Sequence, residues 1–274
     1  MVKRMRKISG IFCLVGFVSL ILIGFLVSIA PKVSVVLAKD DRKYSDDEIP
    51  EKDGDYALRD HPGVRVRVFV HKEKDLAKRQ DALTACSVSD PDSTAVVGST
   101  GWHLASNWTY QLNVNSVPSS VGGSNLPVIA GESFLKWSTV SGDLVSFSRG
   151  ADTRANRARY DGQNVIAWGR ASAGTLGVTY TWYYLNGGQA VETDTILNLK
   201  YSWSWTTYSE TACANPNTYD AYDILIHELG HWMGLDDHYS AEYVDNTMYG
   251  YGSKGEIKKD TLTSGDVAGA QNIY

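Results

Sequence analysis

The chain has 274 residues, with 26 lysines and arginines against 31 aspartates and glutamates, and a formal net charge of −5. Basic residues form no cluster after the first seven positions, which argues against a protein that binds nucleic acid. Residues 91–274 are enough for one domain with a single hydrophobic core.

The N-terminus carries a basic cluster at residues 3–7, followed by an almost unbroken apolar run over residues 8–30. This pattern predicts either a signal peptide or an N-terminal membrane anchor over residues 1–38. Small residues at 36–38 favour cleavage, whereas the length of the apolar run would also let it span a bilayer. Both alternatives place the remaining chain outside the membrane, so we expect a secreted protein or one on the extracellular face of the membrane.

Residues 39–90 form a charged stretch in which acidic side chains are dense between Asp40 and Asp60. Such a composition fits a pro-segment, a spacer or a disordered tail. Residues 64–70, however, read VRVRVFV, with valine at every second position, which predicts a strand and argues against complete disorder. We therefore predict a pro-segment or spacer at 39–90 and a folded domain at 91–274.

The folded domain shows alternating strand patterns and one clear early helix. The helix is predicted over residues 126–137, where Pro127 suits the first turn. Turn formers at 215–217 predict that another helix begins near Thr218 or Asp220. The predicted strands are 108–114, 144–148, 164–168, 176–184 and 191–199.

The most informative segment is residues 227–237, which read HELGHWMGLDD. Helix positions i and i+4 lie on one face, so His227 and His231 can offer ring nitrogens to one metal ion while Glu228 lies beside them. The opposite face is apolar and is expected to pack in the core: Leu225, Leu229 and Trp232. This combination predicts a zinc hydrolase in which Glu228 is the general base.

The pattern HExxHxxGxx followed by a further ligand is the metzincin signature, and residues 227–237 resemble it. Gly234 suits the left-handed turn that redirects the chain after the helix. The third ligand is usually histidine in this family, whereas the slot here holds Asp237, with His238 one residue later. The spacing favours Asp237, because ligation by His238 would need a compensating bulge, and carboxylates do bind zinc.

Two later segments strengthen the resemblance to the matrixin branch of the metzincins. Residues 246–249 resemble the Met-turn, which places a methionine, here Met248, beneath the zinc ligands. Thr263 and Asp266 have capping-box spacing at the start of a segment that resembles the last matrixin helix. The resemblance covers residues 102–274 and implies an α+β zincin fold, a twisted five-stranded mixed sheet with three helices.

The resemblance also implies how a substrate would bind. In the family the fourth strand is a sheet edge that pairs with extended peptide, and here that strand would be 176–184. The alternative, which stays open, is that 176–184 is an ordinary two-sided strand. The loop at 249–253 is expected to shape the pocket for the side chain that follows the cut. A second, structural zinc is not expected, because the upstream histidines lack suitable spacing: His61, His71 and His103. The acidic loop at 152–162 is a weak candidate for calcium.

Three cysteines suit an exported chain. Cys13 lies in the apolar run, so Cys86 and Cys213 are the candidates for a disulfide. Two alternatives stay open: free thiols, or zinc coordination by Cys86 as in the latency switch of animal matrixins, although its neighbours do not match the motif of that switch.

The resulting hypothesis is a secreted zinc metalloendopeptidase with one catalytic Zn²⁺, acting as a monomer on protein or peptide substrates. The alternative is a catalytically silent surface binding protein on a metzincin scaffold. A hydrolase acting on non-peptide amides is a third reading, since the same zinc chemistry cleaves other acyl bonds.

Overall fold

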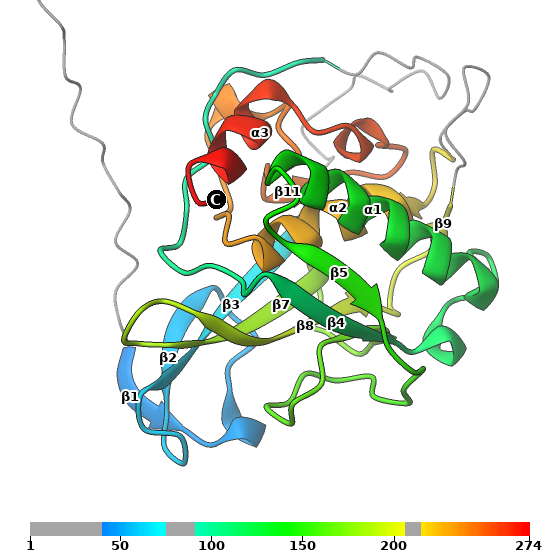
Figure 1. Ribbon diagram of the computed structural model, residues 1–274. Coiled ribbons are helices and arrows are strands. Elements are labelled where there is room, and N and C mark those ends of the chain that lie inside the picture. The colour runs from blue at the N-terminus through cyan, green and yellow to red at the C-terminus, as the bar shows by residue number, and fades with distance from the viewer. Residues whose placement is uncertain (1–39, 75–90, 206–214) are drawn as a thin grey trace, which may run out of the picture. The chain divides into compact units, whose positions relative to one another are not determined.

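A computed structural model describes residues 40–74, 91–205 and 215–274, which form one mixed sheet and three α-helices (Figure 1). The α+β fold expected from the sequence is therefore confirmed. The N-terminal leader and all three cysteines lie outside these residues, so the leader and disulfide hypotheses stay predictions. Within the described ranges, no helix combines the length and apolar character needed to cross a membrane.

The large sheet of the described residues has nine strands, in the order β1-β2-β3-β7-β8-β6-β4-β5 with β11 paired to β3. Its strands are β1 (Asp40–Tyr44), β2 (Gly54–Leu58), β3 (Val64–Glu73), β4 (Asn107–Leu112), β5 (Ser146–Arg149), β6 (Val165–Gly169), β7 (Thr175–Tyr184), β8 (Ala190–Asn198) and β11 (Tyr251–Gly252). A two-stranded sheet joins β9 (Trp203–Ser204) to β10 (Tyr219–Asp220). The five predicted strands correspond to β4 to β8. The sheet has nine strands because β1, β2, β3 and β11, which were not predicted as part of it, also belong to it.

The β3 strand changes the expected position of β7. It pairs antiparallel with β7 along nearly its whole length, from Val64 opposite Tyr184 to Lys72 opposite Thr175. Of the two expectations for 176–184, the exposed edge is therefore wrong for this chain and the two-sided strand is confirmed, because β3 already pairs with the free backbone groups of β7. β3 belongs to the segment that the sequence predicted as a pro-segment or spacer.

Three helices complete the described structure: α1 (Leu126–Val140), α2 (Ala221–Trp232) and α3 (Ser264–Gln271). The α2 helix begins where predicted, because the Asp220 carboxylate accepts hydrogen bonds from the backbone N–H groups of Tyr222 and Asp223 at 2.8 and 3.2 Å. The α3 helix begins with the predicted capping box of Thr263 and Asp266.

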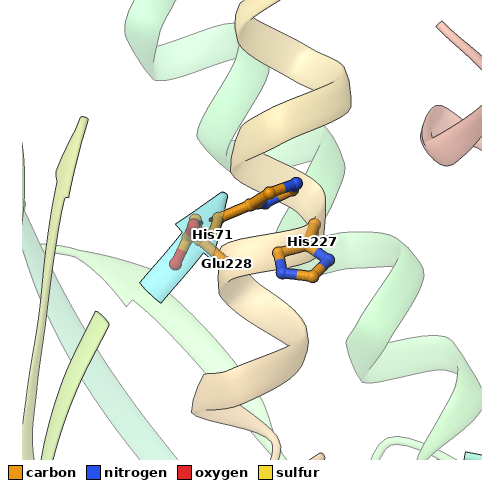
Figure 2. Close-up of side chains that lie close together, drawn as sticks. All are labelled: His71, His227 and Glu228. Atoms are coloured by element: carbon orange, nitrogen blue, oxygen red, sulfur yellow. Dashed lines mark ion pairs between the residues drawn. The ribbon is translucent and has the colours of Figure 1, made fainter. Parts of the chain in front are cut away.

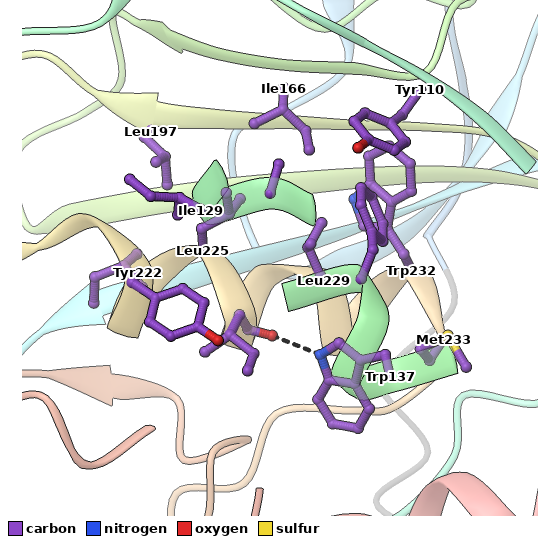
Figure 3. Packing of buried hydrophobic residues seen from close by; sticks show 14 of the residues in the cluster. Tyr110, Ile129, Trp137, Ile166, Leu197, Tyr222, Leu225, Leu229, Trp232 and Met233 are labelled. Carbon is purple, nitrogen blue, oxygen red and sulfur yellow. Dashed lines mark hydrogen bonds between the residues drawn. The ribbon is translucent and has the colours of Figure 1, made fainter. Parts of the chain in front are cut away.

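The core lies where α1 and α2 pack together against the sheet (Figures 1 and 3). Trp137 of α1 donates its indole N–H to the carbonyl oxygen of Ile226 in α2 at 2.9 Å. Trp232 donates to Thr195 of β8 at 2.9 Å and so ties α2 to the sheet. The predicted packing residues Leu225, Leu229 and Trp232 are fully buried. Burying each contributes roughly 1.5–3 kcal/mol, which holds α2 in a fixed orientation.

Candidate active site

Both histidines of α2 have one ring nitrogen fixed by the backbone. His227 Nδ1 lies 2.7 Å from the Thr247 carbonyl oxygen, and His231 Nδ1 lies 2.9 Å from that of Leu235. A carbonyl oxygen can only accept, so each Nδ1 donates and each Nε2 keeps its lone pair. Burial lowers the pKa of His227 to about 3 and that of His231 to about 4, which keeps both rings in the neutral form that binds metals.

The chain turns sharply after α2 and brings Asp237 back to the histidines. Gly234 has φ of 91° there, and a Cβ at this position would lie 2.5 Å from the Trp102 carbonyl oxygen. Asp237 Oδ1 then lies 3.2 Å from His227 Nε2 and 3.6 Å from His231 Nε2. His238 lies outside this group, since its Nε2 accepts from the Gly98 backbone N–H at 2.8 Å.

These three side chains form a donor set that fits a zinc ion. His227 Nε2, His231 Nε2 and Asp237 Oδ1 are buried and have no hydrogen-bond partner. One ligand atom from each lies within 4.8 Å of the other two. Unpaired buried polar atoms are costly, and a cation that bonds to all three removes that cost. Two imidazole nitrogens and one carboxylate oxygen are a common zinc ligand set.

Glu228 is held beside this donor set by β7. Its Oε2 accepts a hydrogen bond from the Thr179 hydroxyl at 2.6 Å, while Oε1 accepts no hydrogen bond from the described residues. A Cβ at Gly177 would lie 2.5 Å from Oε1, so only glycine leaves room for the carboxylate. Burial raises the pKa of Glu228 well above its ordinary value. Neither β7 residue was identified from the sequence, because their proximity to α2 depends on the tertiary fold.

Met248 lies under the helix, fully buried against Gly230, where an added Cβ would overlap Met248 Sδ. The turn that carries it is fixed by Asp266, which accepts from the backbone N–H groups of Thr247 and Met248 at 2.9 and 3.2 Å. Asp266 was expected only as a helix cap. In the structure it also positions Thr247, whose carbonyl oxygen orients His227.

Comparison with known families agrees with this geometry. The matrixin family model matches residues 101–274, nearly the range over which the sequence resembles that family. The chain belongs to the matrixin family. No curated protein matches it. The match begins after residue 100, so strands β1, β2 and β3 lie outside the matrixin part of the chain although they belong to the same sheet.

One buried side chain near the matrixin site comes from that extra segment. His71 of β3 lies beside Glu228 and His227 of α2 (Figure 2). Its Nδ1 is 3.5 Å from Glu228 Oε1, and its ring centroid is 3.8 Å from that of His227. Both ring nitrogens are buried without a hydrogen-bond partner. In the sequence, the spacing of His71 from the other histidines did not indicate a metal site. Strand alternation places it on the same face of β3 as Phe69.

The loop at 152–162 is held by protein groups. Glu192 of β8 accepts from the backbone N–H groups of Asp161 and Gly162 at 2.9 and 2.6 Å. The two metal-compatible groups found among the described residues both include His227, and neither involves this loop. Calcium in this loop stays a prediction.

Proposed function

We propose that the chain is a secreted zinc-dependent endopeptidase, with His227, His231 and Asp237 as the metal ligands and Glu228 as the general base. The observation that carries the proposal is the set of three buried donor atoms without hydrogen bonds, next to Oε1 of Glu228, which also accepts none from the described residues. A metal site beside a carboxylate that does not bind the metal is the arrangement that water-driven peptide hydrolysis needs.

Zinc bound at this site would lower the pKa of water and polarise the scissile carbonyl. Glu228 Oε1 would take a proton from the attacking water as its oxygen bonds to the carbonyl carbon. The carboxyl group would then deliver that proton to the leaving nitrogen as the C–N bond breaks. Thr179 holds Oε2 at 2.6 Å, so the other oxygen is directed toward the reacting atoms.

The substrate class follows from the family, whose members are peptidases, and the proposed substrate is protein or peptide. The basic and apolar leader supports export, with the enzyme secreted or displayed on the extracellular face of the membrane. We propose a monomer, since one chain supplies every residue of the donor set.

The test separates metal binding from proton transfer. Glu228→Gln should bind zinc normally and lose at least about 100-fold in peptide hydrolysis, because general-base catalysis contributes that much or more. His231→Ala should lose both metal and activity. Glu132→Gln, an exposed change on α1, is the matched control for the first variant. Metal content is measured by elemental analysis, and hydrolysis by chelator-sensitive cleavage of a peptide library.

Each variant is also made in a His71→Ala background, because His71 lies against Glu228. Zinc-loaded Glu228→Gln protein with full activity would exclude Glu228 as the base. If the zinc-loaded His71→Ala protein cleaves no peptide, the peptidase proposal fails and the alternative of a silent binding protein is favoured. The presence of both histidine ligands, and of Glu228 beside the donor set, favours the enzyme.

A further inference from the structure

The C-terminal half of β3 is hydrogen-bonded to other backbone segments along both of its edges. On one side is the segment that leads into β7, where Glu73 N–H donates to the Gly174 carbonyl oxygen at 2.8 Å. On the other side is the chain after the Met-turn, where Lys72 and Lys74 N–H donate to the carbonyl oxygens of Gly250 and Gly252 at 3.1 and 2.9 Å. A peptide that adds to a sheet edge makes main-chain hydrogen bonds of the same kind.

The side chains of β3 on the α2 face cover the candidate metal site. Alternate strand residues share a face, so Phe69 and His71 point the same way. Phe69 is fully buried and stacks on His231, with ring centroids 3.9 Å apart and an interplanar angle of 8°. His71 lies against both His227 and Glu228. Two successive residues on one face of β3 therefore cover both histidine ligands and the candidate base.

A water molecule that attacks a peptide must lie between Glu228 and the metal ligands. The His71 ring takes that position, since it contacts Glu228 Oε1 on one side and His227 on the other. Neither ring nitrogen of His71 has a protein partner, and the group His71, His227 and Glu228 has ligand atoms within 4.8 Å of one another. His227 belongs to both metal-compatible groups, whereas the group of His227, His231 and Asp237 does not include His71, so the His71 ring would have to move toward the metal to bind it.

We infer that β3 is an internal occupant of this chain's own peptide-binding cleft, with His71 as a metal ligand in the place of the attacking water. The inference rests on the proposed peptidase function and extends it, because it makes the intact chain a latent enzyme.

Other contacts keep β3 in place. Its opposite face carries Val66, Val68 and Val70, which are buried in a second apolar cluster with Trp182 of β7. At the cleft entrance, Lys72 pairs with Asp53 at 2.8 Å. Arg67 pairs with Asp236 at 3.0 Å. Opening the cleft would expose the three valines, so the chain cannot release β3 by a small local motion.

The first experiment counts imidazole ligands and needs no catalytic activity. X-ray absorption on the zinc-loaded full chain should show three imidazoles in the wild type and two in His71→Ala. His103→Ala is the matched control, because His103 is exposed and far from α2 in sequence and should leave the count at three. Two imidazoles in the wild type would overturn the inference.

The second experiment measures access to the metal in the cobalt-loaded full chain. Acetohydroxamate, a small chelating probe, should shift the visible spectrum of His71→Ala at concentrations at least about tenfold below those needed for the wild type, because an internal ligand lowers apparent affinity. Lys72→Pro keeps His71 but removes the N–H that donates to Gly250, and it should also admit the probe more readily. Equal probe affinity in all three proteins would overturn the inference.

Peptide cleavage completes the test. His71→Ala and Lys72→Pro should cleave a peptide library faster than the wild type. If the uncut wild-type chain cleaves the library as fast as the two variants, the inference is overturned and the peptidase proposal stays intact. The reverse result is also possible: the wild type shows three imidazoles and His71→Ala admits the probe, but no protein cleaves peptide. That result would support the assignment of His71 and exclude the peptidase function.

Discussion

Two regions place buried imidazoles beside Glu228, and they hold them in different ways. On α2 and the turn after it, His227 and His231 each have one ring nitrogen fixed by a backbone carbonyl oxygen, at 2.7 and 2.9 Å. On β3, neither ring nitrogen of His71 makes a hydrogen bond to the described residues, and the ring is placed by strand pairing and by its contacts with Glu228 and His227. The first arrangement is preorganised for a permanent ligand.

The α2 histidines and His71 differ in how easily each could leave a bound metal ion. A histidine oriented by a second hydrogen bond keeps its position when the metal leaves, because that bond remains. His71 keeps its position only as long as β3 stays paired with β7 and β11. The α2 region is therefore the fixed part of the site. β3 is the exchangeable part, because His71 can leave only when the strand unpairs, and the following predictions test how firmly the fixed part is held.

The largest effect is expected at the third ligand of the fixed region. Asp237→Ala should weaken zinc binding by more than about 100-fold, because losing a direct ligand costs more than losing a residue that only orients one. His238→Ala is the matched control and should retain zinc, since His238 accepts from the Gly98 N–H instead. Competition with a chelator measures both affinities. If only His238→Ala loses zinc, the third ligand is His238 and not Asp237.

The next effect concerns the turn that orients His227. Asp266→Ala should lower the free energy of unfolding by about 3 kcal/mol, because a buried carboxylate that accepts several backbone N–H groups is lost. Zinc affinity should fall with it, since Thr247 then loses its fixed position. Asp92→Ala, which removes an exposed partner of Ser264 in the same helix, is the control. Urea unfolding that shows equal stabilities would contradict this role for Asp266.

A smaller effect is expected under the helix. Gly230→Ala should destabilise the protein by about 1–3 kcal/mol, because the new Cβ would overlap Met248 Sδ and lie 2.9 Å from Trp137. Gly131→Ala on α1 is the matched control: nothing lies within 4 Å of its Cβ, so helix propensity should stabilise it by about 1 kcal/mol. Thermal unfolding of the two variants should therefore shift in opposite directions. A stabilised Gly230→Ala would mean that Met248 does not pack tightly against the helix.

The fixed region could be predicted from the sequence because its information is local. Helix periodicity alone aligns His227 with His231, and the left-handed turn at Gly234 follows from glycine's conformational freedom. The cap residues Asp220 and Thr263 are read in the same way. In each case the interacting groups are separated by only a few residues.

The exchangeable region could not be predicted because its information is not local. Alternation identified a strand at 64–70, but it does not say which strand will pair with it. The neighbours of Glu228 pose the same problem, since Thr179 and Gly177 lie about fifty residues before it in the sequence. Assigning β7 as an edge strand was wrong because the pairing partner came from the segment before the matrixin domain.

The smallest effect is expected in the scaffold, away from both regions. Burial raises the pKa of Glu192 from its ordinary 4.5 to about 7. The folded protein therefore binds this proton more tightly than the unfolded chain, and the stability that Glu192 contributes is complete below pH 4.5 and lost as the pH rises toward 7. Glu192→Gln should make stability depend less on pH across this window, because the amide oxygen still accepts from the loop at Asp161 and Gly162 but does not titrate.

Urea unfolding at several pH values between 4.5 and 7.5 would measure the difference, with Glu132→Gln as an exposed control. Buried Glu228 and Asp237 also have raised pKa values, so the wild-type slope contains contributions from the site. Comparing Glu192→Gln with the wild type cancels those contributions, because the site is unchanged. Identical slopes for the two proteins would mean that the Glu192 carboxylate remains ionised in the fold, sufficiently stabilised by the two N–H groups of the loop.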